Sequence, residues 1–435
     1  MRRGLLASSV LVLAAAAGLA GTGTVSIQAS STPGLWSKAA SLTTGREEHT
    51  ATLLRNGNVL VTGGTDGRGK ALASAEVYSP TTNRWTSAGS MAVARLDHTA
   101  TLLSSGKVLV AGGLDGPFPS SALASAELYD PATNSWSGAA PMIGSRARQT
   151  ATLLPDGRVL VVGGLSVALR DAGIFPSQPT SAEIYDPTAN RWLATAPMAQ
   201  YRLDQTVTLL RDGRVVVVGG QDGLISFDSA EIYDPRQDRW FPAAPMVTAR
   251  YGHVATLLAN GDVLVSGGTY QTVVPSNSSA PLASTEIYDP TLDSWSVVAK
   301  MAVPRVEHTA TTLGGGMVLV VGGTGESRAE IYNPAHNVWS DIGAPMNRYN
   351  HTATRLSNGR VLVVGGYGIA SLRSVLVYDP NGELPVTGRL LDPRLILAGV
   401  LVVLLVAGGA ALLTSAVRHQ LRSRQSNVEE SEWIP

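Results

Sequence analysis

Residues 98–136 read HTATLLSSGKVLVAGG, then a loop, then SAELYDPATNSW. This pattern returns along most of the chain, with successive Gly-Gly pairs 43 to 56 residues apart, ending at Gly64, Gly113, Gly164, Gly220, Gly268, Gly323 and Gly366. Repetition at such a period indicates one supersecondary unit per repeat, which buries its apolar faces only against neighbouring units. We therefore expect one large repeat domain.

Each repeat predicts four antiparallel strands. The segment HTATLL alternates in polarity and leads into a two-residue turn such as Asn56-Gly57, which is typical of a tight hairpin. The second strand ends at the Gly-Gly pair, and the third carries a Tyr. An Asp-Pro turn such as Asp130-Pro131 then leads into a fourth strand that carries a Trp.

Fixed spacings separate the framework of the repeat from its variable loops. An Arg stands 17 residues before each Gly-Gly pair, and in six units a Glu stands two residues before the Tyr. A buried charge needs a partner, so the spacing predicts structural Arg-Glu pairs. In the last unit Leu376 replaces the Glu, which makes Arg348 a candidate for a ligand contact. The repeated Tyr and Trp are expected to pack between neighbouring sheets.

The two ends of the repeat region complement each other. Trp36 has no Gly-Gly pair before it, and Tyr378 has no Trp seven residues after it. We therefore expect the segment around residues 36–42 to complete the seventh sheet. Such a strand would close the units into a ring and leave only short, protected sheet edges, as in a β-propeller.

These repeats, with their Met and following Arg, resemble Kelch repeats over about residues 35–380. The Met residues are Met91, Met142, Met198, Met246, Met301 and Met346. The resemblance implies an all-β fold, a seven-bladed Kelch β-propeller over residues 35–383. Together with the terminal segments below, it suggests an exported, membrane-anchored protein of a bacterium.

Both termini predict membrane targeting. Arg2 and Arg3 precede an apolar run from Leu5 to Ala20, so residues 1–30 are expected to form a signal peptide, or else an uncleaved anchor. Residues 395–417 carry no charge over 23 positions, enough for a helix to cross a bilayer core of about 30 Å. Arg418, Arg422 and Arg424 favour a cytoplasmic tail over residues 418–435. The expected topology is single-pass, with the propeller outside the cell and the helix in the lipid bilayer.

The linker over residues 384–394 contains the sequence LPVTG. Leu384, Pro385, Thr387 and Gly388 resemble a sortase sorting signal, which implies cleavage after Thr387 and attachment to the cell wall. The 18-residue tail after Val417 ends acidic, unlike the short basic tails of such signals. Wall anchoring by a sortase is therefore the alternative to a retained membrane helix.

One polar position recurs three residues after each Arg. It holds His49, His98, His253, His308 and His351, with Gln149 and Gln205 at the equivalent places. Converging imidazoles can hold a metal. However, Gln replaces His well as a hydrogen-bond donor and poorly as a metal ligand, so we expect a structural role. The sequence predicts no metal site and no cofactor.

Aromatic residues outside the framework fall on one predicted loop face: Phe118, Phe175, Tyr201, Phe227, Tyr251, Tyr270, Tyr349 and Tyr367. Exposed aromatics on loops held by a rigid ring suit a glycan or protein ligand. The alternative is that several of them pack their own loops. Equal numbers of acidic and basic residues, 33 each, give no reason to expect nucleic acid as a partner.

The favoured prediction is thus a non-enzymatic, membrane-tethered binding module. The alternative is an exported sugar-modifying Kelch enzyme, resembling an epimerase, that would use carboxylates at the channel mouth: Glu47, Glu48, Asp97, Asp204 and Glu307. Copper-radical oxidases of the galactose oxidase type also use a Kelch-like propeller. That resemblance implies a Tyr-Cys cross-link, which a chain without Cys cannot form.

Overall fold

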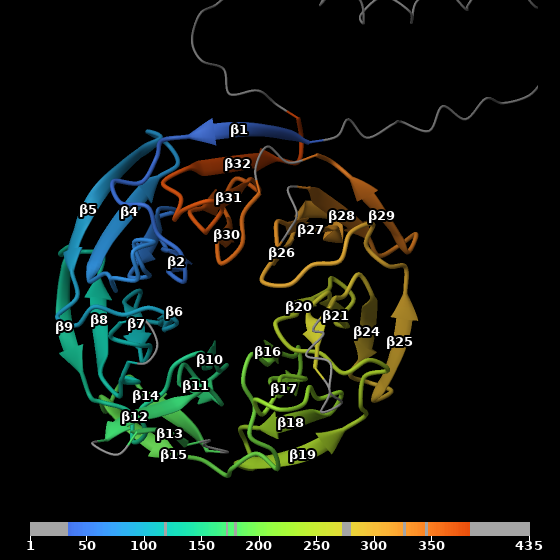
Figure 1. The fold of residues 1–435 in the computed structure, drawn as a ribbon, viewed down its shortest axis with the longest axis horizontal. Helices are drawn as coiled ribbons and strands as arrows, with labels where there is room; N and C mark the ends of the chain where they lie inside the picture. The colour runs from blue at the N-terminus through green and yellow to red at the C-terminus, as the bar shows by residue number, and fades with distance from the viewer. Residues whose placement is uncertain are drawn as a thin grey trace, which may run out of the picture. The chain divides into compact units, whose positions relative to one another are not determined.

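The computed structural model describes residues 34–116, 120–170, 173–177, 181–271, 280–324, 328–343 and 347–382, with backbone alone over 167–177. Within these ranges the chain forms seven four-stranded antiparallel sheets and no α-helix. Figure 1 shows the sheets arranged as the blades of a ring, with the first strand of each blade innermost. The predicted all-β, seven-bladed propeller is confirmed.

The blades follow one another along the chain, and each runs outward from its first strand. The strands of blades 1 and 2 are β2 (Thr50–Leu53), β3 (Val59–Thr62), β4 (Ser74–Ser79), β5 (Arg84–Ser90), β6 (Thr99–Leu102), β7 (Val108–Ala111), β8 (Ala126–Asp130) and β9 (Ser135–Ala139). Those of blades 3 and 4 are β10 (Thr150–Leu153), β11 (Val159–Val162), β14 (Ala182–Asp186), β15 (Arg191–Ala194), β16 (Thr206–Leu209), β17 (Val215–Val218), β18 (Ala230–Asp234) and β19 (Arg239–Ala243).

Blades 5 and 6 are built in the same way. Their strands are β20 (Val254–Leu257), β21 (Val263–Ser266), β24 (Thr285–Asp289), β25 (Ser294–Val298), β26 (Thr309–Thr312), β27 (Val318–Val321), β28 (Ala329–Asn333) and β29 (Val338–Asp341), with the short 3-10 helix η1 (Gly314–Gly316) between β26 and β27. Two hairpins outside the blades are β12 (Ser166–Arg170) with β13 (Gly173–Ser177) and β22 (Thr269–Tyr270) with β23 (Ala280–Pro281).

The N-terminal strand closes the ring. Blade 7 has the strand order β1-β32-β31-β30, in which β1 (Leu35–Ala39) comes from the start of the chain and β30 (Thr352–Arg355), β31 (Val361–Val364) and β32 (Val375–Asp379) from its end. Trp36 lies opposite Tyr378 in the antiparallel register of β1 and β32. The inner strand β2 contacts β30 on one side and β6 on the other. The orphan Trp of the sequence thus supplies the missing fourth strand.

Apolar clusters between neighbouring blades form the core. One cluster joins Leu160 and Ile184 of blade 3 to Val215 and Tyr233 of blade 4, all of them buried. In every blade the Tyr and Trp rings lie 4.9 to 5.2 Å apart between centroids. The indole of Trp240 also donates across the blade interface to the carbonyl of Ala196, at 2.8 Å. The repeated aromatics therefore hold blades together.

The Gly-Gly pairs permit close approach between blades. Gly163 has φ +67°, and a Cβ on it would lie 2.4 Å from Nε2 of Gln205 in the next blade. Gly164 has φ +90°, and a Cβ there would lie 2.7 Å from the Ala147 carbonyl. Only glycine combines a left-handed backbone with this lack of space.

The six predicted Arg-Glu pairs are present and buried. Their N–O distances run from 2.7 to 3.2 Å: Arg46–Glu76, Arg95–Glu127, Arg146–Glu183, Arg202–Glu231, Arg250–Glu286 and Arg305–Glu330. Arg348, opposite Leu376, does not face a ligand as the sequence suggested. It is fully buried, donates to the carbonyls of Gly365 and Ser374, and has its pKa lowered to about 10 by burial.

The predicted membrane-targeting segments lie outside the described residues. These are the signal peptide over 1–30, the linker over 384–394 with its LPVTG sequence, the helix over 395–417 and the tail over 418–435. Among the residues that the structure describes, no helix is both long and apolar enough to cross a membrane.

Candidate functional site

Seven equivalent residues, one from each blade, form a ring at the channel mouth. Each directly precedes the repeated His or Gln and has φ between 51° and 61°: Glu48, Asp97, Arg148, Asp204, Gly252, Glu307 and Asn350. This left-handed conformation costs a residue with a side chain of the order of 1 kcal/mol or more, and such strain is often found at functional sites. The backbone position therefore repeats in every blade, while the side chain does not.

Backbone hydrogen bonds link this ring from blade to blade. The amide of Asp97 donates to the carbonyl of Glu48 at 3.2 Å, and the amide of Arg148 donates to that of Asp97 at 3.0 Å. In six blades the residue before the ring position also forms a β-bridge with the residue after the Gly-Gly pair, as Glu47 does with Thr65. The ring side chains are thus anchored by the scaffold itself.

These side chains line a cavity of about 500 Å³. Its lining includes Glu48, Asp97, Asp204 and Glu307, four of the five carboxylates that the sequence placed at the mouth. The same cavity is lined by Arg148, Gln149, Gln221, Tyr251 and Asn350. Residues more than 300 positions apart along the chain therefore contribute to one site.

The mouth holds more carboxylates than cations. Arg148 Nε lies 3.1 Å from Asp97 Oδ2, and the carboxylates around Arg148 raise the pKa of its guanidinium. Burial, followed by the charges of Asp97 and Glu47, raises the pKa of Glu48 to about 8. Burial also raises the pKa of Asp97 and of Glu307. The cavity therefore holds closely spaced acids that disfavour one another's ionised forms.

Neutral donors stabilise individual carboxylates. Gln221 Nε2 donates to Asp204 Oδ2 at 2.9 Å, and Ser371 Oγ donates to Glu47 Oε1 at 3.0 Å. Burial nevertheless raises the pKa of Glu47 above its ordinary value. The hydrogen bonds orient these acids and do not neutralise them.

The repeated His and Gln join neighbouring blades, and two of them, His98 and Gln149, also line the cavity. His253 Nε2 lies 2.8 Å from Thr206 Oγ1 of the preceding blade, and Gln149 Nε2 donates to the Ala111 carbonyl at 2.8 Å. Complete burial holds the pKa of His98 and of His308 down at about 3. Among the described residues no group of three or more His, Cys, Asp or Glu could hold a metal ion. Neutral His and Gln thus do the same structural task.

The aromatic residues predicted to bind a ligand do not share one environment. Tyr251 lines the cavity, and Tyr349 and Tyr367 pack against each other at 5.4 Å between ring centroids. Among those whose side chains the structure describes, Tyr270 is the most exposed, at 38%. Phe118 lies outside the described residues, and the side chain of Phe175 does too.

Tyr201 and Phe227 are not the exposed side chains that the sequence suggested. They are 8% and 9% exposed, and the Phe227 ring lies 5.5 Å from the guanidinium carbon of Arg202. Both rings are therefore packed into the fold, and the Phe227 ring lies against the guanidinium of Arg202. The hydroxyl of Tyr201 is buried without a hydrogen-bond partner, and burial together with Asp204 raises its pKa.

Sequence reasoning missed Arg148, Gln221 and Asn350. A signal for Arg148 existed, because it precedes Gln149 at the position where four other blades carry an acid. It also missed exposed aliphatic side chains on the connections and loops of the same face: Ile143, Leu224, Ile225, Val247 and Ile369. Nothing in their spacing separates them from packed aliphatic residues.

Comparisons with known proteins agree with this geometry. The sequence model of the Kelch motif matches residues 50–92, 98–143, 208–247 and 250–302. Kelch-like protein 28 of Mus musculus is 33% identical over 103 residues, which are 24% of this chain and 18% of that protein. Kelch repeat-containing protein kel-10 of Caenorhabditis elegans is 36% identical over 100 residues, 22% of this chain and 16% of that protein. The matches thus span less than a fifth of these relatives.

Solved structures share the fold. A fungal alcohol oxidase of the AA5 family, in complex with copper, superposes with a TM-score of 0.64 at 18% identity, covering 80% of this chain and 77% of the oxidase. The structure of YjhT superposes with a TM-score of 0.54 at 15% identity, covering 70% of this chain and 99% of YjhT. Superpositions at identities this low show a common fold and do not show that the proteins share an activity. The chain therefore carries matches to the Kelch motif over four stretches and folds as an all-β seven-bladed propeller.

Proposed function

We propose that this protein is a cell-surface binding module whose acidic channel mouth takes a basic side chain of a protein ligand. The observation that carries the proposal is the convergence of four carboxylates from four blades on one cavity of about 500 Å³. Kelch propellers generally bind protein partners, which supports a protein as the ligand.

Charge complementarity explains why the ligand would be basic. Burial and neighbouring acids raise the pKa of Glu48, Asp97 and Glu307, so ionising all of them together is unfavourable. A Lys or Arg side chain that enters the mouth would lower these pKa values and strengthen its own binding. A concave surface of one charge also raises the association rate of an oppositely charged partner.

The cell-surface location rests on the sequence. The expected signal peptide over 1–30 and the apolar segment over 395–417 would place the mouth outside the cell, and the LPVTG sequence would allow attachment to the wall instead. Tyr270, Tyr349 and Tyr367 remain candidates for further contacts with the ligand. A glycan that stacks on these rings is the alternative ligand class.

The test is binding of the full chain to fluorescent pentalysine, with pentaglutamate as the matched probe. The double variant Asp204→Asn, Glu307→Gln should weaken pentalysine binding about tenfold through loss of two nearby charges. Asp341→Asn, on the exposed outer strand β29, should leave it unchanged. Equal affinity of wild type and double variant, or equal binding of both probes, would contradict the proposal.

A second candidate, an exported sugar-modifying enzyme, is favoured by one observation. With a pKa of about 8, Glu48 keeps its proton at neutral pH and lies beside further carboxyl groups, an arrangement suited to general acid catalysis. The check is a turnover screen against sugars and sugar acids with the wild type and Glu48→Gln. Turnover that Glu48→Gln abolishes would establish this candidate, and its absence leaves the binding module.

A further inference from the structure

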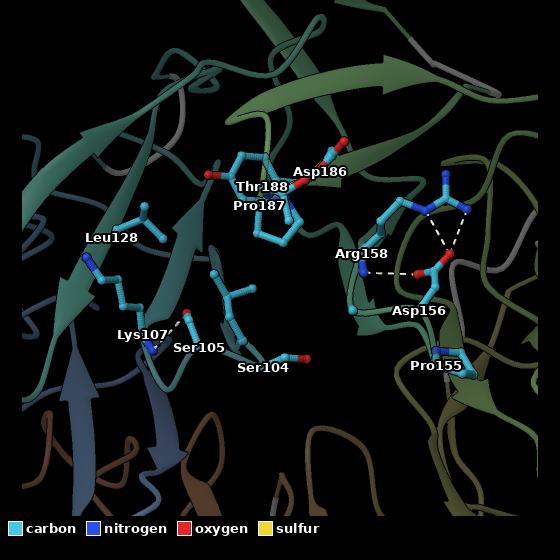
Figure 2. Close-up of a pocket in the computed structure, with 13 residues that line it drawn as sticks. Ser104, Ser105, Lys107, Leu128, Pro155, Asp156, Arg158, Asp186, Pro187 and Thr188 are labelled. Atoms are coloured by element: carbon cyan, nitrogen blue, oxygen red, sulfur yellow. Dashed lines mark hydrogen bonds and ion pairs between the residues drawn. The ribbon is translucent and has the colours of Figure 1, made fainter.

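A groove of about 630 Å³ lies between blades 2 and 3. Its lining comes from the turns that join first to second strands and third to fourth strands, at the opposite end of the strands from the Gly-Gly pairs and hence on the face opposite the mouth. Figure 2 shows Ser104, Ser105 and Lys107 on one side and Pro155, Asp156 and Arg158 on the other, with Pro187 and Thr188 between them around an open centre.

At two other blade interfaces an arginine side chain occupies the position equivalent to this groove. Between blades 1 and 2, Arg55 Nη2 donates to the carbonyl of Ser104, in the next blade's turn. Between blades 4 and 5, Arg211 Nη2 donates in the same way to the carbonyl of Ala259. The aliphatic part of each arginine crosses the turn glycine of the next blade, as Cδ of Arg55 does at 3.5 Å from a Cβ placed on Gly106.

A short side chain leaves the groove between blades 2 and 3 open. Ser104 is the residue equivalent to Arg55 and Arg211, since each directly follows the Leu that ends the HTATLL-type segment. Its Oγ lies 3.3 Å from a Cβ placed on the turn glycine, Gly157. The side chain of Ser104 therefore reaches Gly157 but is too short to continue across the turn as the side chains of Arg55 and Arg211 do. The equivalent carbonyl acceptor is that of Pro155.

We propose that this groove binds an arginine side chain presented by a protein partner. The chain itself shows the ligand chemistry, because it places a guanidinium in the same position at two other interfaces. Leu128, Tyr185 and Pro187 provide apolar surface for the methylene groups, and the Pro155 carbonyl provides the acceptor. The site is separate from the mouth and does not depend on the function proposed for it.

The cations of the lining are already neutralised locally. Lys107 Nζ lies 3.2 Å from Asp130, and Arg158 lies 2.8 Å from Asp156. In Figure 2 the Arg158–Asp156 pair lies at one side of the groove and does not fill its centre. A planar guanidinium can donate to a carbonyl while its methylene groups cover a glycine turn, whereas an ammonium offers only a compact, strongly hydrated charge. The groove should therefore prefer arginine to lysine.

The probe for the test is N-acetyl-arginine amide, followed by amide NMR shifts of the full chain. Arg55 and Arg211 are themselves exposed, so a single arginine should bind weakly, with saturation in about the millimolar range. We expect shifts at Gly157 and Thr188, and much smaller shifts with the citrulline and lysine analogues. Similar shifts with all three probes would overturn the proposal.

Two variants test the assignment without threatening the fold, because both positions are exposed. Ser104→Arg should fill the groove and abolish the shifts at Gly157. Arg55→Ser should open the equivalent groove between blades 1 and 2 and add a second set of shifts at Gly106. Persistence of the Gly157 shifts in Ser104→Arg, or no new shifts in Arg55→Ser, would overturn the inference. The pentalysine assay of the mouth should not change in either variant.

Discussion

Removing Glu183 should cost this propeller a large part of its stability. The Glu183 carboxylate, 3% exposed, accepts hydrogen bonds from the amides of Ile143 and Gly144 at 2.7 and 3.0 Å. It also accepts from Nε and Nη2 of Arg146 at 3.1 and 2.8 Å. Glu183→Ala would leave a buried guanidinium without its counter-charge and two partly buried amides without their acceptor.

Breaking one partner of a buried ion pair typically costs about 3–5 kcal/mol. Arg146 retains hydrogen bonds to the carbonyls of Gly163 and Ser181, so we expect the lower end, about 3 kcal/mol. Glu183→Leu should cost less than Glu183→Ala, because blade 7 already accommodates Leu376 beside a buried arginine. The matched control is Lys107→Ala, which breaks the exposed Lys107–Asp130 pair and should cost about 1 kcal/mol or less.

The assay is urea denaturation followed by tryptophan fluorescence. Trp192 is buried in the same blade and packs against Tyr185 at 5.1 Å between ring centroids, so it reports on the damaged region. A shift of the urea midpoint for Glu183→Ala no larger than that of the Lys107→Ala control would refute the reasoning. So would a Glu183→Leu variant less stable than Glu183→Ala.

Three further predictions follow from the scaffold and the mouth. Because the folded pKa of Glu48, about 8, lies above its unfolded value, its contribution to stability is present below about pH 4.5 and is lost as the pH rises toward 8. The melting temperature of Glu48→Gln should therefore fall less over this pH range than that of the wild type, and parallel curves for the two proteins would argue against this reasoning. His308→Gln should preserve the melting temperature far better than His308→Ala, since Gln149 and Gln205 already serve at that position; equal losses would exclude the proposed interchange. Gly163→Ala should destabilise by more than about 1 kcal/mol, since its Cβ would meet Gln205, whereas Gly138→Ala, with nothing within 4 Å, should be neutral in the same melting experiment; a neutral Gly163→Ala would show that the close approach carries no weight.

Much of the scaffold could be predicted because its signals are local and repeated. Period and turn residues indicated four strands per unit, and the spacing from Tyr to Trp placed one aromatic pair in each blade. The orphan Trp36 indicated ring closure, because strand pairing follows from which partner each end lacks. The six Arg-Glu pairs followed from one spacing and the rule that buried charges are paired. The ligand contact suggested for Arg348 was wrong, because its guanidinium is buried and donates to the carbonyls of Gly365 and Ser374.

The sequence by itself therefore determined the fold and the roles of the repeated residues. Only the tertiary structure decided the sites. Glu48 and Asn350 meet because the ring closes, and the ring residues point into one mouth because their backbone is left-handed and bonded from blade to blade. The burial of Phe227 against Arg202 is visible only in the folded chain. The role proposed for the groove beside Ser104 follows from the comparison with the interface that Arg55 crosses. Sites of this kind arise where non-repeated side chains from distant segments come into contact, and the local spacing of residues does not predict such contacts.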